Sequence, residues 1–69
     1  MKKQAVLKRI KAAAKAAGLE YREVELTRHT GIIVGTTRNT IGRHSEVPDG
    51  TARAFWKQFE NELGEGWWK

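Results

Sequence analysis

The sequence contains no cysteine, only two histidines and no long hydrophobic run. Without cysteine, neither a disulfide nor a thiolate metal site is possible, which agrees with a reducing cytoplasm. The histidines, His29 and His44, lack the spacing of zinc ligands, so we expect no metal and no cofactor. Lysines and an arginine interrupt the apolar stretch from 5 to 17, and we therefore expect neither a signal-peptide core nor a membrane span.

A chain of 69 residues allows one domain, and we assign positions 1–69 to it. Its 13 Lys and Arg residues outnumber 8 Asp and Glu, which gives a formal net charge of +5 and a pI of about 10.0. For so small a domain this balance favours polyanionic partners, and nucleic acid above all. Ordinary solubility is the alternative explanation of the same charge.

The first segment, about Lys3 to Ala17, has the spacing of an amphipathic helix. Its apolar face comprises Val6, Leu7, Ile10, Ala13, Ala14 and Ala17. Lys8, Lys11 and Lys15 line another face at i, i+3 and i+7, where they are candidate contacts for phosphate. Gly18 is placed to end the helix in a left-handed conformation.

The middle of the chain changes to the period of β-strands. Apolar and polar residues alternate from 21 to 28, which is the pattern of a half-buried strand. A second strand is expected over Gly31 to Gly35 and a third over Thr40 to Arg43, joined as a hairpin. Because Thr36-Thr37 is poor chemistry for a two-residue turn, we expect a longer loop between these strands.

The last third returns to helical spacing. Its apolar stripe comprises Ala52, Phe55, Trp56, Phe59 and Leu63. Pro48 suits the first turn of such a helix and Gly64 suits its end. The predicted architecture is α+β in the order α-β-β-β-α, a three-stranded antiparallel sheet with two helices packed on one face. Trp67 and Trp68, in the tail from 65 to 69, either fold back over the core or form a partner surface.

The two-residue period of strands places both histidines on the side of the sheet away from the helices. If Ile32 and Ile41 face the helices and pair with each other, His29 lies opposite His44 on the open side. The other pairs of this register are Gly31 with Gly42 and Thr30 with Arg43. The two glycines then leave a shallow surface beside the histidines, open enough to admit a ribose or a phosphate.

His29 and His44 have the chemistry that RNA cleavage requires. The reaction needs a base for the proton of the 2′-hydroxyl, an acid for the leaving oxygen and cations for the charge on the phosphorane. Histidine moves protons near neutral pH, and Arg28, Arg38 and Arg43 flank the pair to hold phosphate. The alternative is a pair of ordinary exposed histidines at strand ends on a basic surface.

At these residues the sequence resembles the HicA-like mRNA interferase toxins. That family has a histidine at the start of its second strand, where this chain has Thr27-Arg28-His29-Thr30. A more specific match follows, with a strand ending in Ile41-Gly42-Arg43-His44, then Glu46-Val47, then Gly50-Thr51 at the start of a helix that reaches Trp56-Lys57-Gln58. The chain departs from the family pattern at Thr27-Arg28, where the family has Gly-Ser, and at Gly42-Arg43, where a proline precedes the histidine. The tail is a further departure.

The resemblance implies a fold similar to double-stranded RNA-binding domains. It implies a metal-independent endoribonuclease that cleaves messenger RNA as the toxin of a type II toxin–antitoxin system, with His29 catalytic and His44 auxiliary. It further implies a cognate antitoxin and a cytoplasmic location away from membranes, and it leaves the oligomeric state open. Two other functions remain: a non-catalytic nucleic-acid-binding module that uses the arginines and helix lysines, and a protein-interaction module that uses the Trp tail.

Overall fold

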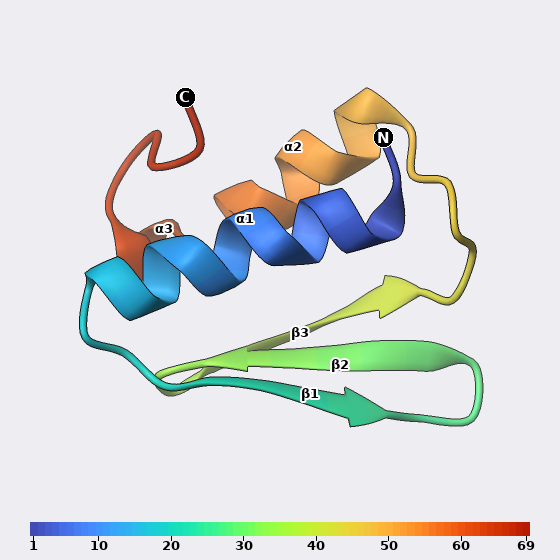
Figure 1. Cartoon of the computed structure of the whole chain (residues 1–69), viewed down its shortest axis with the longest axis horizontal. Helices are drawn as coiled ribbons and strands as arrows, with labels where there is room; N and C mark the ends of the chain where they lie inside the picture. The colour runs from blue at the N-terminus through green and yellow to red at the C-terminus, as the bar shows by residue number, and fades with distance from the viewer.

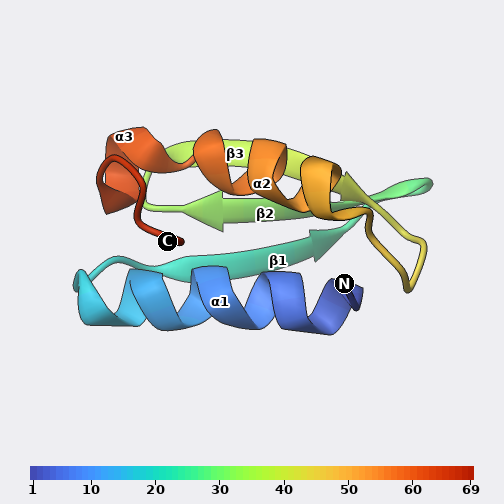
Figure 2. The ribbon, with the colours of Figure 1, turned by 90° about the horizontal axis from the view of Figure 1, so that it is seen from above.

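The computed structural model describes all of residues 1–69 and consists of an open sheet covered on one face by helices (Figure 1). In chain order the elements are α1 (Lys3–Ala16), β1 (Tyr21–Glu25), β2 (His29–Val34), β3 (Thr37–Gly42), α2 (Asp49–Lys57) and α3 (Glu60–Leu63). The strands form an antiparallel sheet in the order β1-β2-β3, which confirms the predicted α+β architecture. Seen from above, α1 runs beside β1, and α2 lies over β2 and β3 (Figure 2).

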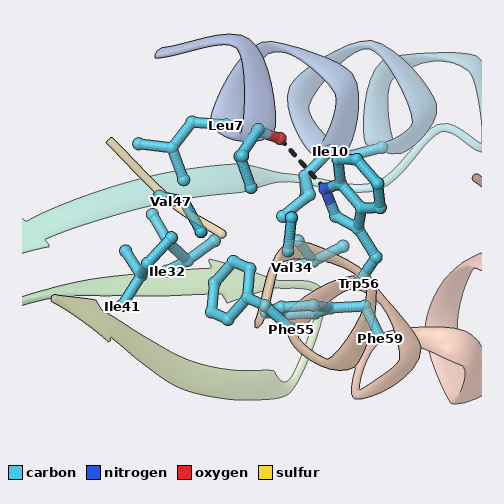
Figure 3. Close-up of a cluster of buried hydrophobic side chains, with 12 residues drawn as sticks. Leu7, Ile10, Ile32, Val34, Ile41, Val47, Phe55, Trp56 and Phe59 are labelled. Atoms are coloured by element: carbon cyan, nitrogen blue, oxygen red, sulfur yellow. Dashed lines mark hydrogen bonds between the residues drawn. The ribbon is translucent and has the colours of Figure 1, made fainter. Parts of the chain in front are cut away.

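One hydrophobic core lies between the helices and the sheet (Figure 3). Ile10 of α1, Ile32 of β2 and Phe59 after α2 are fully buried in it. The indole nitrogen of Trp56 also donates a hydrogen bond to the carbonyl oxygen of Val6 at 3.2 Å, which ties α2 to α1. The apolar stripes of the predicted helices therefore pack against each other and against the sheet, as their spacing indicated.

β2 and β3 are joined by the two-residue turn Gly35-Thr36, and the longer loop that we predicted is wrong. Gly35 has a φ of +59°, the left-handed value that the first position of a type II′ turn needs. The carboxylate of Glu62 in α3 holds the turn. It accepts hydrogen bonds from the Thr36 amide at 3.1 Å and from the Thr36 and Thr37 hydroxyls, both at 3.0 Å. The turn thus depends on a contact from a distant part of the chain.

The shorter turn shifts the pairing of β3 by two residues from the predicted register. The observed partners are Asn39 for Ile32, Gly42 for His29, Ile41 for Thr30 and Thr40 for Gly31, where we predicted Ile41, His44, Arg43 and Gly42. A shift of two residues leaves each side chain on its original face of the sheet. Ile41 therefore still faces the helices together with Ile32, and His29 still faces the open side.

β1 presents its apolar and polar sides the other way round from an ordinary half-buried strand. Glu23 and Glu25 face the helix layer, because they pair with helix-facing residues of β2. Val24 and Leu26 lie on the open side, with 38% and 45% of their surface exposed. Both carboxylates are exposed to water although they face the helices, because β1 is an edge strand.

The predicted C-terminal helix is divided in two, because the backbone leaves helical geometry at Phe59 (φ −103°, ψ 11°). Beyond α3 the tail folds back over the core. The indole nitrogen of Trp67 donates to the carbonyl oxygen of Trp56 at 2.8 Å, and Arg9 donates to that of Trp68 at 3.1 Å. The first of the two tail positions that we considered is therefore the one observed. None of the helices combines the length and the apolar character that crossing a membrane requires.

Candidate nucleic-acid interface

No helix covers the second face of the sheet (Figure 1). His29, the first residue of β2, lies on this face. Its side chain is exposed, and strand alternation places it on the same face as Gly31 and Ile33. The strand is the central one of the sheet, so its backbone is paired on both sides. An imidazole on such a strand is open to a large substrate, and its backbone is held in a defined position.

His44 lies beyond the end of β3, two residues after Gly42. A Cβ added at Gly42 would lie 3.9 Å from Cδ2 of His44, and Gly42 is also the cross-strand partner of His29. The two histidines are therefore next to the same glycine at one end of the sheet. The predicted direct pairing of the histidines is wrong, and both lie next to Gly42, one of the two glycines that we expected beside them.

All three predicted arginines are exposed, but they lie at different distances from His29, because the partner of Arg38 in β2 is four residues, about 13 Å, along the strand. Arg28 precedes His29 in the turn between β1 and β2, and Arg38 lies on the open face as the partner of Ile33. The strands contribute no carboxylate to this face, because Glu23 and Glu25 point to the helix layer. The charge of the strand residues on the open face is therefore entirely positive.

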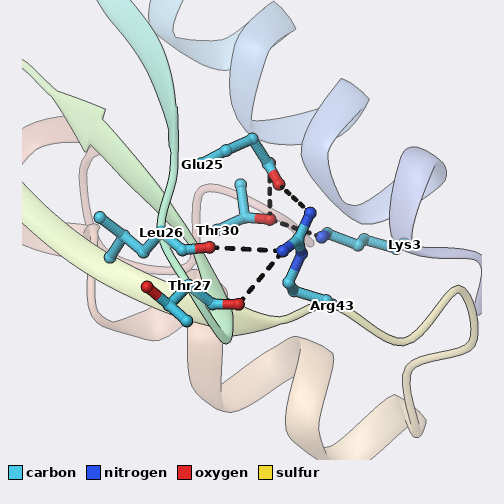
Figure 4. A network of polar contacts seen from close by, with 6 residues as sticks. All are labelled: Lys3, Glu25, Leu26, Thr27, Thr30 and Arg43. Atoms are coloured by element: carbon cyan, nitrogen blue, oxygen red, sulfur yellow. Dashed lines mark hydrogen bonds and ion pairs between the residues drawn. The ribbon is translucent and has the colours of Figure 1, made fainter.

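Arg43 is engaged within the protein (Figure 4). Its guanidinium forms an ion pair with Glu25 at 3.0 Å and donates to the carbonyl oxygens of Leu26 at 3.4 Å and Thr27 at 3.2 Å. These contacts fasten the end of β3 to the turn that leads to His29. The structure therefore gives Arg43 a positioning role at this turn, which the predicted register did not indicate.

Lys3, Glu25 and Thr30 belong to the same network, and no pattern in the sequence pointed to the first two (Figure 4). The hydroxyl of Thr30 accepts a hydrogen bond from the Lys3 ammonium at 2.6 Å and donates one to Glu25 at 2.9 Å. Thr30 is fully buried. No spacing in the sequence relates positions 3, 25 and 30, so only the fold brings them together.

The three lysines of α1 lie in the other layer of the molecule. Lys8 and Lys11 border a hollow that is also lined by Glu23 of β1, and Lys15 is exposed in the last turn of the helix. α1 packs on the face of the sheet opposite to the one that His29 faces, so the lysines and the histidine lie in different layers of the protein (Figure 1). The predicted contacts are thus divided between two sides of the protein.

No group of three His, Cys, Asp or Glu side chains gathers anywhere in the chain in a way that would hold a metal ion. The chain matches no protein-family model, and no curated protein or solved structure matches it at a significant level. The arrangement of its own residues is therefore the basis for assigning a function.

Proposed function

We propose that this protein is an endoribonuclease that cleaves messenger RNA without a metal ion, as the toxin of a type II toxin–antitoxin pair, with His29 as its general acid or base. The observation that carries the proposal is the exposed His29 on a sheet face that no helix covers and to which the strands contribute no carboxylate. His44 lies next to Gly42, the cross-strand partner of His29; Arg28 directly precedes His29, and Arg38 lies further along the same face as the partner of Ile33. The resemblance to HicA-like toxins supports the same role for His29.

The chemistry that suits these groups is attack by the 2′-oxygen on the adjacent phosphorus. One imidazole takes the proton of the 2′-hydroxyl as the new O–P bond forms, and the bond from phosphorus to the 5′-oxygen breaks as that oxygen gains a proton. His29 and His44 divide these two proton transfers between them. The guanidinium of Arg28 offsets the charge that develops on the phosphorane, and Arg38, further along the same face, contributes positive charge to hold the RNA strand.

A toxin of this kind acts in the cytoplasm and needs a cognate antitoxin. A cationic, uncovered sheet face favours an acidic protein as that partner, because complementary charge speeds association and orients the two surfaces. Covering His29 would block access of RNA to the site without any change in the toxin's own fold.

The test is incubation of the purified protein with a long RNA in EDTA. We expect fragments from the wild type and a cleavage rate lower by about 10² to 10⁴ in His29→Ala, the range over which a general acid or base contributes. Because the side chain is exposed, the substitution should change the free energy of unfolding by no more than about 0.5 kcal/mol. Fragments from both proteins at the same rate would contradict the role of His29.

A non-catalytic nucleic-acid-binding module is the second candidate, and the lysines on α1 favour it. Lys8, Lys11 and Lys15 form a cationic row on a helix that has no acidic residue. Intact RNA in the same experiment, with a salt-sensitive mobility shift from both proteins, would establish this function. The packing of Trp67 and Trp68 against the core does not favour the third candidate, a partner surface made by the tail.

A further inference from the structure

The open face of the sheet contains a hollow of about 310 Å³ beside His29. Six residues line it, five from the three strands and one, Leu26, that directly follows β1. They are Val24, Leu26, Gly31, Ile33, Arg38 and Thr40. Gly31 is at its centre, because it pairs with Val24 on one side and Thr40 on the other. His29 lies two residues before Gly31 on the same face, about 6.5 Å along the strand.

The hollow exists because position 31 has no side chain. A Cβ there would lie 3.4 Å from the carbonyl oxygen of Val24 and 3.7 Å from Cδ1 of Leu26, which are ordinary contact distances. Val24 and Leu26 form one wall and are the most exposed large apolar side chains of the chain. Since the helices cover the other face of the sheet, nothing in the protein accounts for keeping this apolar surface open to water.

The surroundings of the hollow define the chemistry of its occupant. Its walls are apolar, while its rim carries the guanidinium of Arg38 and the hydroxyl of Thr40. The imidazole of His29 adds a further polar group, and the strands place no carboxylate on this face. A flat, largely apolar ring attached to negative charge fits this arrangement. A nucleobase on its sugar-phosphate backbone is such a group, because apolar walls pack on the base and a guanidinium stacks or hydrogen-bonds at its edge.

We propose that this hollow binds one unpaired nucleobase next to the bond at His29, so that the protein acts on single-stranded RNA. The inference rests on the proposed function, and it adds the class of RNA and the residues that select it. A base within a duplex is stacked and paired, so it reaches an apolar hollow only after it leaves the helix, at a cost in free energy. An unpaired strand has no such cost.

The variant that tests the hollow is Gly31→Ala. Its added methyl group occupies the centre of the hollow while it makes only ordinary contacts with Val24 and Leu26. Gly31 does not have a positive φ, so alanine adopts the same backbone conformation. Gly50→Ala in α2 is the matched control, because a Cβ there meets nothing within 4 Å. Circular dichroism and the thermal midpoint establish that each variant is folded.

The substrates are one RNA strand, the same strand annealed to its complement, and the same strand with an abasic nucleotide beside the cleaved bond. We expect the wild type to cleave the single strand at least about tenfold faster than either of the others, in line with the contribution of one stacked base. Gly31→Ala should cleave the intact single strand about tenfold more slowly than the wild type. On the abasic strand, Gly31→Ala and the wild type should cleave at the same rate. Gly50→Ala should match the wild type on all three substrates.

Equal cleavage of single strand and duplex by the wild type would overturn this inference and leave the proposed function standing. Cleavage of the abasic strand by the wild type as fast as the intact strand would also overturn this inference, and that result requires no variant. If the protein neither cleaves nor binds any of the three RNAs, the proposed function fails, and the inference fails with it.

Discussion

Thr30 is the only polar residue whose side chain is completely buried in this chain. Its hydroxyl is bonded on both sides, as acceptor from the Lys3 ammonium and as donor to Glu25. The Lys3 ammonium has no carboxylate in an ion pair with it, so this hydroxyl is its acceptor within the fold. Thr30 follows His29 directly, and its two hydrogen bonds help to hold the start of β2, which presents the imidazole.

Replacing Thr30 with valine should destabilise the protein by about 1 to 3 kcal/mol. The shape of the side chain is retained, but the hydrogen bonds that join the buried hydroxyl to the Lys3 ammonium and the Glu25 carboxylate are lost, and hydrogen bonds to charged partners contribute about that much. Urea unfolding at neutral pH measures the change. Thr40→Val, at an exposed position on β3, is the control and should stay within about 0.5 kcal/mol of the wild type. An equal effect of the two substitutions would contradict the bridging role.

At the scale of elements, α3 stabilises the hairpin between β2 and β3. Glu62 reaches the turn from α3 and accepts hydrogen bonds from Thr36 and Thr37. The backbone amide of Thr36 contributes most, followed by the hydroxyls of Thr36 and Thr37, and together they lower the pKa of the Glu62 carboxyl from its usual value of 4.5. The charged carboxylate is therefore the form that the folded state prefers, and α3 and the turn stabilise each other more strongly while it is charged.

Substituting Glu62 with glutamine should produce a stability difference that depends on pH. A pKa lower in the folded than in the unfolded state adds stability above the usual carboxyl value, and this stability is lost as the pH falls through the folded-state value. The wild type should therefore unfold at higher urea than Glu62→Gln at pH 7, and the gap should narrow once the pH falls below about 4.5.

The control for that series is Glu65→Gln in the tail, which removes an exposed carboxylate that accepts no hydrogen bond from the turn. Its urea midpoint should follow the wild type at each pH. A gap between wild type and Glu62→Gln that stays as wide at pH 3 as at pH 7 would mean that the carboxylate's charge does not stabilise the turn.

At the scale of the whole molecule, positive charge is divided between two layers. The open sheet face has His29 and Arg38, with Arg28 in the turn that leads to His29, while Lys8, Lys11 and Lys15 lie on α1 over the opposite face. Under the proposed function, RNA held against the sheet would therefore be attracted by the lysines mainly from a distance. Such attraction raises the rate of encounter and weakens steeply with salt, whereas contacts at the site itself persist.

Changing Lys8, Lys11 and Lys15 together to glutamine removes three of the five net positive charges. We expect about tenfold weaker RNA binding at low ionic strength and a much smaller loss in several hundred millimolar salt. The cleavage rate at saturating RNA should not change, because His29 lies in the other layer. Fluorescence anisotropy and single-turnover cleavage measure these two quantities, and a lower saturated rate would place the lysines at the site after all.

The candidate site was predictable in part, and the limit is visible in its residues. The alternation of β2 alone placed His29 on the open side, and a register error of two residues did not change that. The same register error wrongly made His44 the direct partner of His29 and hid the contacts of Arg43. Cross-strand neighbours depend on the length of the turn, which the sequence pattern did not determine. The sequence predicted an open surface at Gly31 but not the hollow around it. The wall of the hollow, Val24 and Leu26, comes from β1, and the alternation of that strand did not determine which of its faces lies on the open side.

By itself, the sequence determined the order of helix, strands and helix, the two apolar stripes that form the core, and the open side on which His29 lies. These features follow from periodicity within single segments, which local sterics and burial impose. Only the tertiary structure decided the two-residue turn, the reversed faces of β1, the break at Phe59 and the folded-back tail. Each of these depends on a partner far away in the chain, such as Glu62 at the turn or Trp56 beneath Trp67, and no local pattern encodes such a contact.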